Sequence, residues 1–393
     1  MEKLPIGISD FKQVKEEGYY YVDKSLFIKE VLDNVKIILL TRPRRFGKTI
    51  NLSLLRYFFE KANTDTSYLF KDLKIWKEGG PYTRHQGQYP VIFLTFKGVK
   101  EDNWEKTYEW FRNIIAEEFK DHSYLLKNNF LTGDEKTLFK KIINRNASEL
   151  EYKNSLRTLS AFLYRYHQQR VVILIDEYDT PVNASYLNGF YEQTTPFMRS
   201  LFEGAYKDNE YLEKGVITGI LRVAKEGFFS GLNNLKAYSV LSHPFADKFG
   251  FTEAEVIQML EDYGVKEALP TIQAWYNGYV VGNQAVIYNP WSILNYVDTR
   301  EDGLRPHWVN TSDNALIQEL IVDDEFKNRK RLLELIDGQG FVMRPSETMI
   351  FPGLRGDETA VWTLLLYGGY LNAINRRRDD NDEFFYLRYD DTQ

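Results

Sequence analysis

Residues 41–49 read Thr41-Arg42-Pro43-Arg44-Arg45-Phe46-Gly47-Lys48-Thr49, and they are the most informative segment of the chain. It follows an apolar run over residues 35–40 and precedes a second apolar segment over residues 50–55. The first run predicts a strand and the second a helix. A Gly-Lys-Thr turn between a strand and a helix brings backbone N–H groups and a helix N-terminus against an anion. We therefore predict a phosphate-binding loop.

The loop departs from the usual pattern, which is a glycine, four residues and then Gly-Lys-Ser/Thr. Gly47, Lys48 and Thr49 are present, but Arg42 occupies the position of the first glycine. Four cations lie within seven residues, namely Arg42, Arg44, Arg45 and Lys48. Such a concentration of positive charge suits a polyphosphate. We interpret the stretch as a degenerate P-loop.

A second element carries two acids at the end of an apolar run. Residues 171–177 read Val171-Val172-Ile173-Leu174-Ile175-Asp176-Glu177. This pattern is typical of a buried parallel strand, which delivers its last residues to the edge of the sheet where nucleotides bind. We expect Asp176 to hold Mg²⁺ together with the Thr49 hydroxyl, and Glu177 to orient or deprotonate the attacking water. The alternative is that the two acids merely end a core strand.

Composition limits the class of protein. The chain has 393 residues, enough for two domains or for one large α/β domain with an appendage. The net charge of -6 argues against a surface that binds nucleic acid or anionic lipid throughout, although a local basic patch stays open. There is no cysteine, which excludes disulfides and thiolate sites, and the five histidines show no zinc-ligand spacing. Without a leader or a long apolar window, we expect a cytoplasmic protein with no membrane partner.

Further strands complete the predicted sheet, at residues 91–96, 215–220 and 237–241. Arg222 follows the second of these strands, and we hypothesise that it senses the γ-phosphate. The alternative is a surface arginine at a strand end. Near the N-terminus, three consecutive tyrosines at 19–21 could pack against a base, but packing over the sheet edge is the favoured interpretation.

The pattern changes near His243-Pro244, so we predict a core over residues 1–245 and a second region over residues 246–393. Thr252-Glu253-Ala254-Glu255 is a capping box that opens a helix. A hairpin with Gly282-Asn283 in its turn is expected next. Asn289-Pro290-Trp291-Ser292 then begins another helix. These elements suggest a helical lid or a winged-helix-like unit.

Several motifs together resemble the bacterial AAA-ATPase-like family, in order and in content. They are Tyr21-Val22-Asp23-Lys24, residues 42–49, residues 173–181, Thr218-Gly219-Ile220-Leu221-Arg222, Ser230-Gly231-Leu232-Asn233-Asn234, Trp275-Tyr276-Asn277-Gly278-Tyr279, Tyr288-Asn289-Pro290-Trp291-Ser292 and Trp308-Val309-Asn310-Thr311-Ser312. Arg42 is not a departure from this family, which itself carries Arg-Pro-Arg-Arg-Phe-Gly-Lys.

The resemblance implies an α/β P-loop NTPase of the additional-strand type. Its parallel sheet would have the order 5-1-4-3-2, with helices on both faces and a C-terminal, mainly helical lid. ATP and Mg²⁺ are the implied cofactors. Longer family members continue into a PD-(D/E)XK-type nuclease domain, through which they could meet nucleic acid. This chain ends at Gln393, where such a domain would begin, so we predict no DNA cleavage.

Our first functional hypothesis is Mg²⁺-dependent ATP binding with slow hydrolysis that drives a conformational switch. The expected nucleotide-binding residues are Arg44, Arg45, Phe46, Gly47, Lys48, Thr49 and Ile50, with Thr49 and Asp176 at the metal and Lys48, Glu177 and Arg222 in catalysis. A GTPase is less favoured because the chain has no Asn-Lys-x-Asp motif. The second hypothesis is a nucleotide-gated interaction module with negligible hydrolysis, bound to a protein partner or to a second copy. The third is a P-loop relic without a ligand.

Overall fold

The computed structural model describes the chain except for residues 63, 128–129, 223–228, 230–231, 233, 277, 283–284, 306–326, 347–350, 352–353, 355–356, 358, 380–381 and 389–393. Three of the quoted motifs are affected. The motif at 308–312 lies outside the described residues, and so do three of the five residues of the motif at 230–234 and Asn277 of the motif at 275–279.

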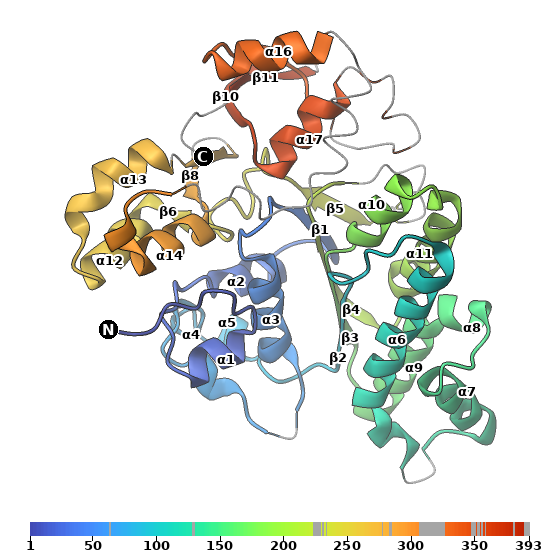
Figure 1. The fold of residues 1–393 in the computed structure, drawn as a ribbon. Coiled ribbons are helices and arrows are strands. Elements are labelled where there is room, and N and C mark those ends of the chain that lie inside the picture. Colours follow the sequence, from blue (N-terminus) through green and yellow to red (C-terminus); the bar gives the residue numbers. More distant parts are fainter. Residues whose placement is uncertain are drawn as a thin grey trace.

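A five-stranded parallel sheet forms the centre of the molecule (Figure 1). Its strands are β1 (Ile37–Thr41), β2 (Val91–Thr95), β3 (Val171–Asp176), β4 (Leu212–Gly219) and β5 (Leu235–Tyr238). They lie in the order β2-β3-β4-β1-β5, and every pairing is parallel. Read from the other edge this is 5-1-4-3-2, so the predicted order is confirmed. Each residue of β1 and β3 is buried, which explains why both strands read as continuous apolar runs.

Helices cover both faces of the sheet (Figure 1). One face carries α1 (Phe11–Glu16), α2 (Leu26–Leu32), α3 (Lys48–Phe59), α4 (Lys74–Lys77) and α5 (Gly80–Thr83). The other carries α6 (Trp104–Asp121), α7 (Gly133–Ile143), α8 (Glu149–Lys153), α9 (Ser155–His167), α10 (Thr180–Leu187) and α11 (Tyr191–Tyr206). Because side chains alternate along a strand, Ile38 and Leu40 join the first core, whereas Ile37 and Leu39 join the second.

The chain after the sheet builds two smaller antiparallel sheets. In the first, β6 (Phe251–Thr252) and β7 (Tyr279–Val281) flank β8 (Ala285–Tyr288), so the predicted hairpin is confirmed. The helices beside it are α12 (Glu253–Asp262), α13 (Leu269–Trp275) and α14 (Pro290–Asp298). Thr252 and Glu255 make both hydrogen bonds of the predicted capping box on α12.

The second small sheet has the order β10-β11-β9. It consists of β9 (Phe341–Met343), β10 (Asn372–Asp379) and β11 (Asp382–Arg388), and its neighbouring helices are α16 (Lys327–Ile336) and α17 (Ala360–Gly368). In the part of the chain that the structure describes, each helix is too short or too polar to cross a membrane.

Candidate nucleotide site

The loop between β1 and α3 has the backbone of an anion site. Gly47 caps the N-terminus of α3 with a φ of 82°, a left-handed conformation that glycine adopts without steric cost. The N–H of Asn51 is bonded to the carbonyl of Gly47 at 3.1 Å. The N–H groups of Lys48, Thr49 and Ile50 precede it and have no carbonyl within the helix to bind. The positive end of the α3 dipole therefore faces the loop with donors that have no partner within the helix.

Lys48 is folded back into this loop. Its ammonium donates to the carbonyls of Arg42 at 3.1 Å and Pro43 at 2.9 Å, and the side chain is buried. Burial lowers the pKa of Lys48, an effect that the negative charges of Glu177, Asp179 and Asp176 oppose. The lysine is thus a buried cation held by neutral partners, and a phosphate oxygen would be a stronger one.

Asp176 lies at the tip of β3 and contacts the loop directly. The Thr49 hydroxyl donates to its Oδ2 at 2.8 Å, although the two residues are 127 positions apart in sequence. Thr218, on the neighbouring strand β4, donates to Oδ1 at 2.7 Å, and Thr95, at the end of β2, donates to Oδ2 at 3.4 Å. Burial raises the pKa of Asp176, while the hydrogen bonds from Thr218 and Thr49 lower it. Three hydroxyls therefore fix the orientation of this carboxylate.

The pair formed by Thr49 and Asp176 fits magnesium. A hydroxyl and a carboxylate are hard oxygen ligands of the kind that Mg²⁺ selects, and the ion keeps water and phosphate oxygens for its remaining positions. Within the described ranges, no three or more histidine, aspartate or glutamate side chains gather around a common point. Thr49 and Asp176 are therefore the candidate protein ligands for such an ion.

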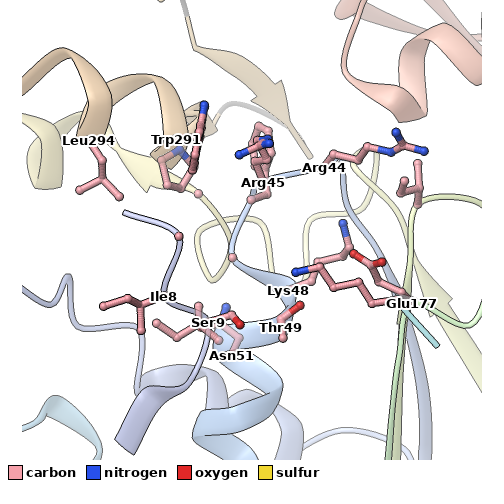
Figure 2. Close-up of a pocket in the computed structure, with 18 of the residues that line it drawn as sticks. Ile8, Ser9, Arg44, Arg45, Lys48, Thr49, Asn51, Glu177, Trp291 and Leu294 are labelled. Atoms are coloured by element: carbon pink, nitrogen blue, oxygen red, sulfur yellow. The ribbon is translucent and has the colours of Figure 1, made fainter. Parts of the chain in front are cut away.

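Glu177 follows Asp176 with unusual backbone geometry. Its φ of 50° is left-handed, a conformation that costs a non-glycine residue ~1–3 kcal/mol and that concentrates at functional sites. The side chain lines a cavity of about 530 Å³ in front of the loop. Figure 2 shows Glu177 beside Lys48, on the side of the cavity away from α14. A carboxylate held there is placed to act on a water molecule next to a phosphate.

The other end of the cavity is mostly apolar. Ile8 and Ser9 come from the N-terminal segment, and Trp291 and Leu294 come from α14 (Figure 2). Asn289 caps α14 through its side chain, and Pro290 occupies the first helical position, so the helix begins where it presents Trp291 to the cavity. The Arg45 guanidinium lies over the Trp291 ring, 3.8 Å from its centroid. The cavity therefore joins a charged end to a flat aromatic surface.

All seven of the loop residues expected to bind a nucleotide line the cavity, from Arg44 to Ile50. Arg44 and Arg45 leave the loop in different directions, Arg45 toward Trp291 and Arg44 toward the side of Glu177 (Figure 2). The ring of Phe46 is buried in the core and packs edge-on against Tyr279 at 5.2 Å, so only its backbone can serve a ligand. Of the three N-terminal tyrosines, Tyr20 and Tyr21 line the cavity, and Tyr21 also packs on Phe11.

The inclusion of Arg42 among the phosphate-facing cations is wrong. Its guanidinium is fully buried and donates to the carbonyls of Thr41 at 2.8 Å, Tyr238 at 3.1 Å and Phe245 at 3.0 Å. It also lies over the ring of Phe249. Burial lowers the pKa of Arg42 to about 10. Arg42 directly follows β1, which pairs with β5. Its hydrogen bonds therefore link the end of β1 to β5, through Tyr238, and to the chain after β5, through Phe245.

The segment after β4 is held by an acid that sequence reasoning missed. Asp179 accepts hydrogen bonds from the N–H groups of Ile220 at 2.8 Å and Leu221 at 2.9 Å. The sequence signal for Asp179 is its position two residues after Glu177, within the family motif at residues 173–181. Ile220 and Leu221 line the cavity, whereas Arg222 is not among the described residues of that lining. Contact between Arg222 and a phosphate stays a prediction.

Comparison with known proteins agrees with this geometry. An uncharacterized protein in the vnfD 5′ region of Azotobacter chroococcum mcd 1 is 29% identical over 325 residues. The alignment covers 82% of this chain and 56% of the relative, so the chain spans little more than half the length of that protein. Residues 5–229, which include the sheet strands β1 to β4, the loop and both acids, match the family described as predicted AAA-ATPase. The chain belongs to this AAA-ATPase-like family.

Proposed function

We propose that the chain binds Mg-ATP in this cavity and hydrolyses it slowly, and that the cycle drives a conformational switch. One observation carries the proposal: Thr49 at the start of α3 bonds to Asp176 at the tip of β3, 2.8 Å apart, beside Lys48 and the first N–H groups of the helix. A metal-bound triphosphate requires this combination of a hydroxyl, a carboxylate and a cation.

Each group at the charged end has a role in the proposal. Lys48 would leave the carbonyls of its own loop and bridge the β- and γ-phosphates, while the N–H groups from Gly47 to Ile50 cradle them. Arg44 would offset the charge of the transferred phosphoryl group, and so would Arg222 if it swings inward. Magnesium, held by Thr49 and Asp176, would supply charge neutralisation. Glu177 would orient the attacking water and accept its proton.

The apolar end of the cavity would take the base. Ile8, Trp291 and Leu294 offer the flat, non-polar surface on which a purine stacks. The preference for ATP over other nucleotides rests on membership of the family. The stack of Arg45 on Trp291 joins the loop to α14, so a ligand that moves either residue would also move the C-terminal region. That contact is also what favours the second candidate, a nucleotide-gated interaction module.

Replacing Glu177 by Gln separates the two candidates. The substitution keeps size and polarity but removes the proton acceptor, and such acceptors contribute about 10²–10⁴-fold to rate. We expect the full chain and Glu177→Gln to bind Mg-ATP with dissociation constants within about threefold, by calorimetry, and turnover of the variant to fall at least about 100-fold, by phosphate release. Equal turnover of the two proteins would leave only the interaction module. Absence of binding at millimolar Mg-ATP would refute both.

A further inference from the structure

Asp179 is a buried carboxyl group whose hydrogen bonds go to two backbone N–H groups. The side chain is 1% exposed, and its Oδ2 accepts from the N–H groups of Ile220 and Leu221. Burial raises the pKa of Asp179, and the two backbone hydrogen bonds lower it. A buried carboxylate is costly to keep, and among the described residues the donors that bind this one are main-chain N–H groups, so it fixes the position of that main chain.

Hydrogen bonds from Tyr178 also hold this backbone segment in place. The Tyr178 hydroxyl donates to the carbonyl of Leu221 at 2.7 Å, and the N–H of Tyr178 donates to the carbonyl of Thr218 at 3.1 Å. Gly219 lies between these contacts. A Cβ at this position would stand 2.7 Å from the Tyr178 ring and 2.8 Å from Asp179 Oδ1. Glycine is therefore required for the turn after β3 to approach the end of β4 so closely.

The segment held by Asp179, residues 220–221, lies between residues of the candidate site. Thr218 precedes it and bonds to Asp176, Ile220 and Leu221 form part of the cavity wall, and Arg222 follows at once. Residues 176–179 thus present Glu177 to the cavity, hold Thr49 through Asp176, and use the side chains of Tyr178 and Asp179 to hold the adjacent strand end. A shift of the strand end would move the wall of the cavity and the base of the Arg222 side chain together.

We propose that Asp179 is a positioning residue, which holds the backbone of residues 220–221 and thereby sets the position from which the Arg222 side chain reaches the transferred phosphate. This inference rests on the proposed ATPase function for its kinetic consequence, but the hydrogen bonds themselves are independent of it. The role predicts that Asp179 affects turnover through Arg222 and leaves the affinity for Mg-ATP almost unchanged.

The kinetic test is a double-mutant cycle on the full chain. We expect Asp179→Ala to lower kcat at least about tenfold with KM for Mg-ATP within about twofold, and Asp179→Asn, which keeps an oxygen acceptor, to recover activity to within about threefold. Asp179→Ala added to Arg222→Ala should cause no further loss. Additive losses, or equal activity of the Ala and Asn variants, would overturn the proposal. If Asp179→Ala does not fold, Tyr178→Phe decides: a several-fold lower kcat at constant KM supports the proposal, and an unchanged kcat refutes it.

A second readout separates this inference from the proposed function. Amide hydrogen exchange at Ile220 and Leu221 should quicken in Asp179→Asn by at least about threefold, while exchange in β1 stays unchanged, because a neutral acceptor holds these donors less strongly. This measurement needs no nucleotide. Unchanged exchange would refute the role of Asp179 in holding residues 220–221, even if the chain is an active ATPase. Faster exchange in a chain that never hydrolyses ATP would support that role of Asp179 and refute the proposed ATPase function.

Discussion

The two ends of the cavity are built in different ways. The charged end comes from residues 44–50 of one loop and from Glu177 after one strand tip, with Asp176 buried behind Thr49, and short motifs specify these side chains. The apolar end is assembled from the N-terminal segment and from α12 and α14, which are far apart along the chain. Charge and metal chemistry require particular residues at close spacing, so they are visible in a sequence. A surface for a flat base requires only shape, which tertiary packing supplies from distant segments.

The largest expected effect is at the charged end. Lys48→Ala should weaken binding of Mg-ATP at least about 100-fold, or ~2.7 kcal/mol, because the variant loses the buried cation that the phosphates would engage. Binding of magnesium tripolyphosphate, which has no base, should weaken as much. Calorimetry measures both ligands, and the rise in melting temperature that Mg-ATP gives the parent chain should vanish.

Lys214→Ala is the matched control for this variant. Lys214 is also a buried lysine that donates to backbone carbonyls, those of Leu32, Asn34 and Val35, but it lies outside the cavity. The control should lose stability and keep its affinity for both ligands. If it lost affinity as Lys48→Ala does, general destabilisation would explain both results and the phosphate role of Lys48 would be wrong.

The buried strands and the contact between the P-loop and the acidic strand could be predicted from the sequence. The apolar runs of β1 and β3 gave the buried strands, and the family resemblance gave their order. The meeting of Thr49 with Asp176 followed from the rule that parallel strands end at one edge. Arg42 shows the limit of such reasoning, since four cations in seven residues say nothing about the direction of each side chain. Arg42 points into the molecule, where its guanidinium binds the carbonyls of Tyr238 and Phe245.

The residues of the apolar end could not be predicted from the sequence, for a different reason. The pattern around Asn289 and Pro290 predicts a helix start, and the structure confirms it. Which side of that helix meets the P-loop depends on how the whole C-terminal region packs, and on the left-handed backbone of Arg45, which has a φ of 64°. No spacing rule links Arg45 to Trp291. The aromatic rings of the N-terminal tyrosines suggest contact with a base, whereas nothing in the sequence marks Ile8 and Ser9 as cavity residues.

A smaller effect is expected at this apolar end. Trp291→Ala should weaken Mg-ATP about tenfold, because stacking of a base on an aromatic ring contributes ~1–3 kcal/mol. Magnesium tripolyphosphate should bind the variant as it binds the parent chain. Trp275→Ala is the control, since Trp275 belongs to the same C-terminal region and is 39% exposed. Equal losses for both ligands would mean that Trp291 serves the phosphates and that the two ends are not separate.

The smallest effect distinguishes two neighbouring arginines. Arg45 contributes to the apolar end through its stack on Trp291, and a cation–π contact of this kind contributes ~0.5–2 kcal/mol. Arg45→Ala should therefore weaken Mg-ATP about threefold and leave tripolyphosphate unchanged. Arg44→Ala should weaken both ligands, because Arg44 is close enough for its charge to lower the pKa of Lys48. Loss of tripolyphosphate binding in Arg45→Ala would show instead that Arg45 leaves Trp291 for the phosphates. The boundary between the two ends would then lie beyond the loop, at α14 itself.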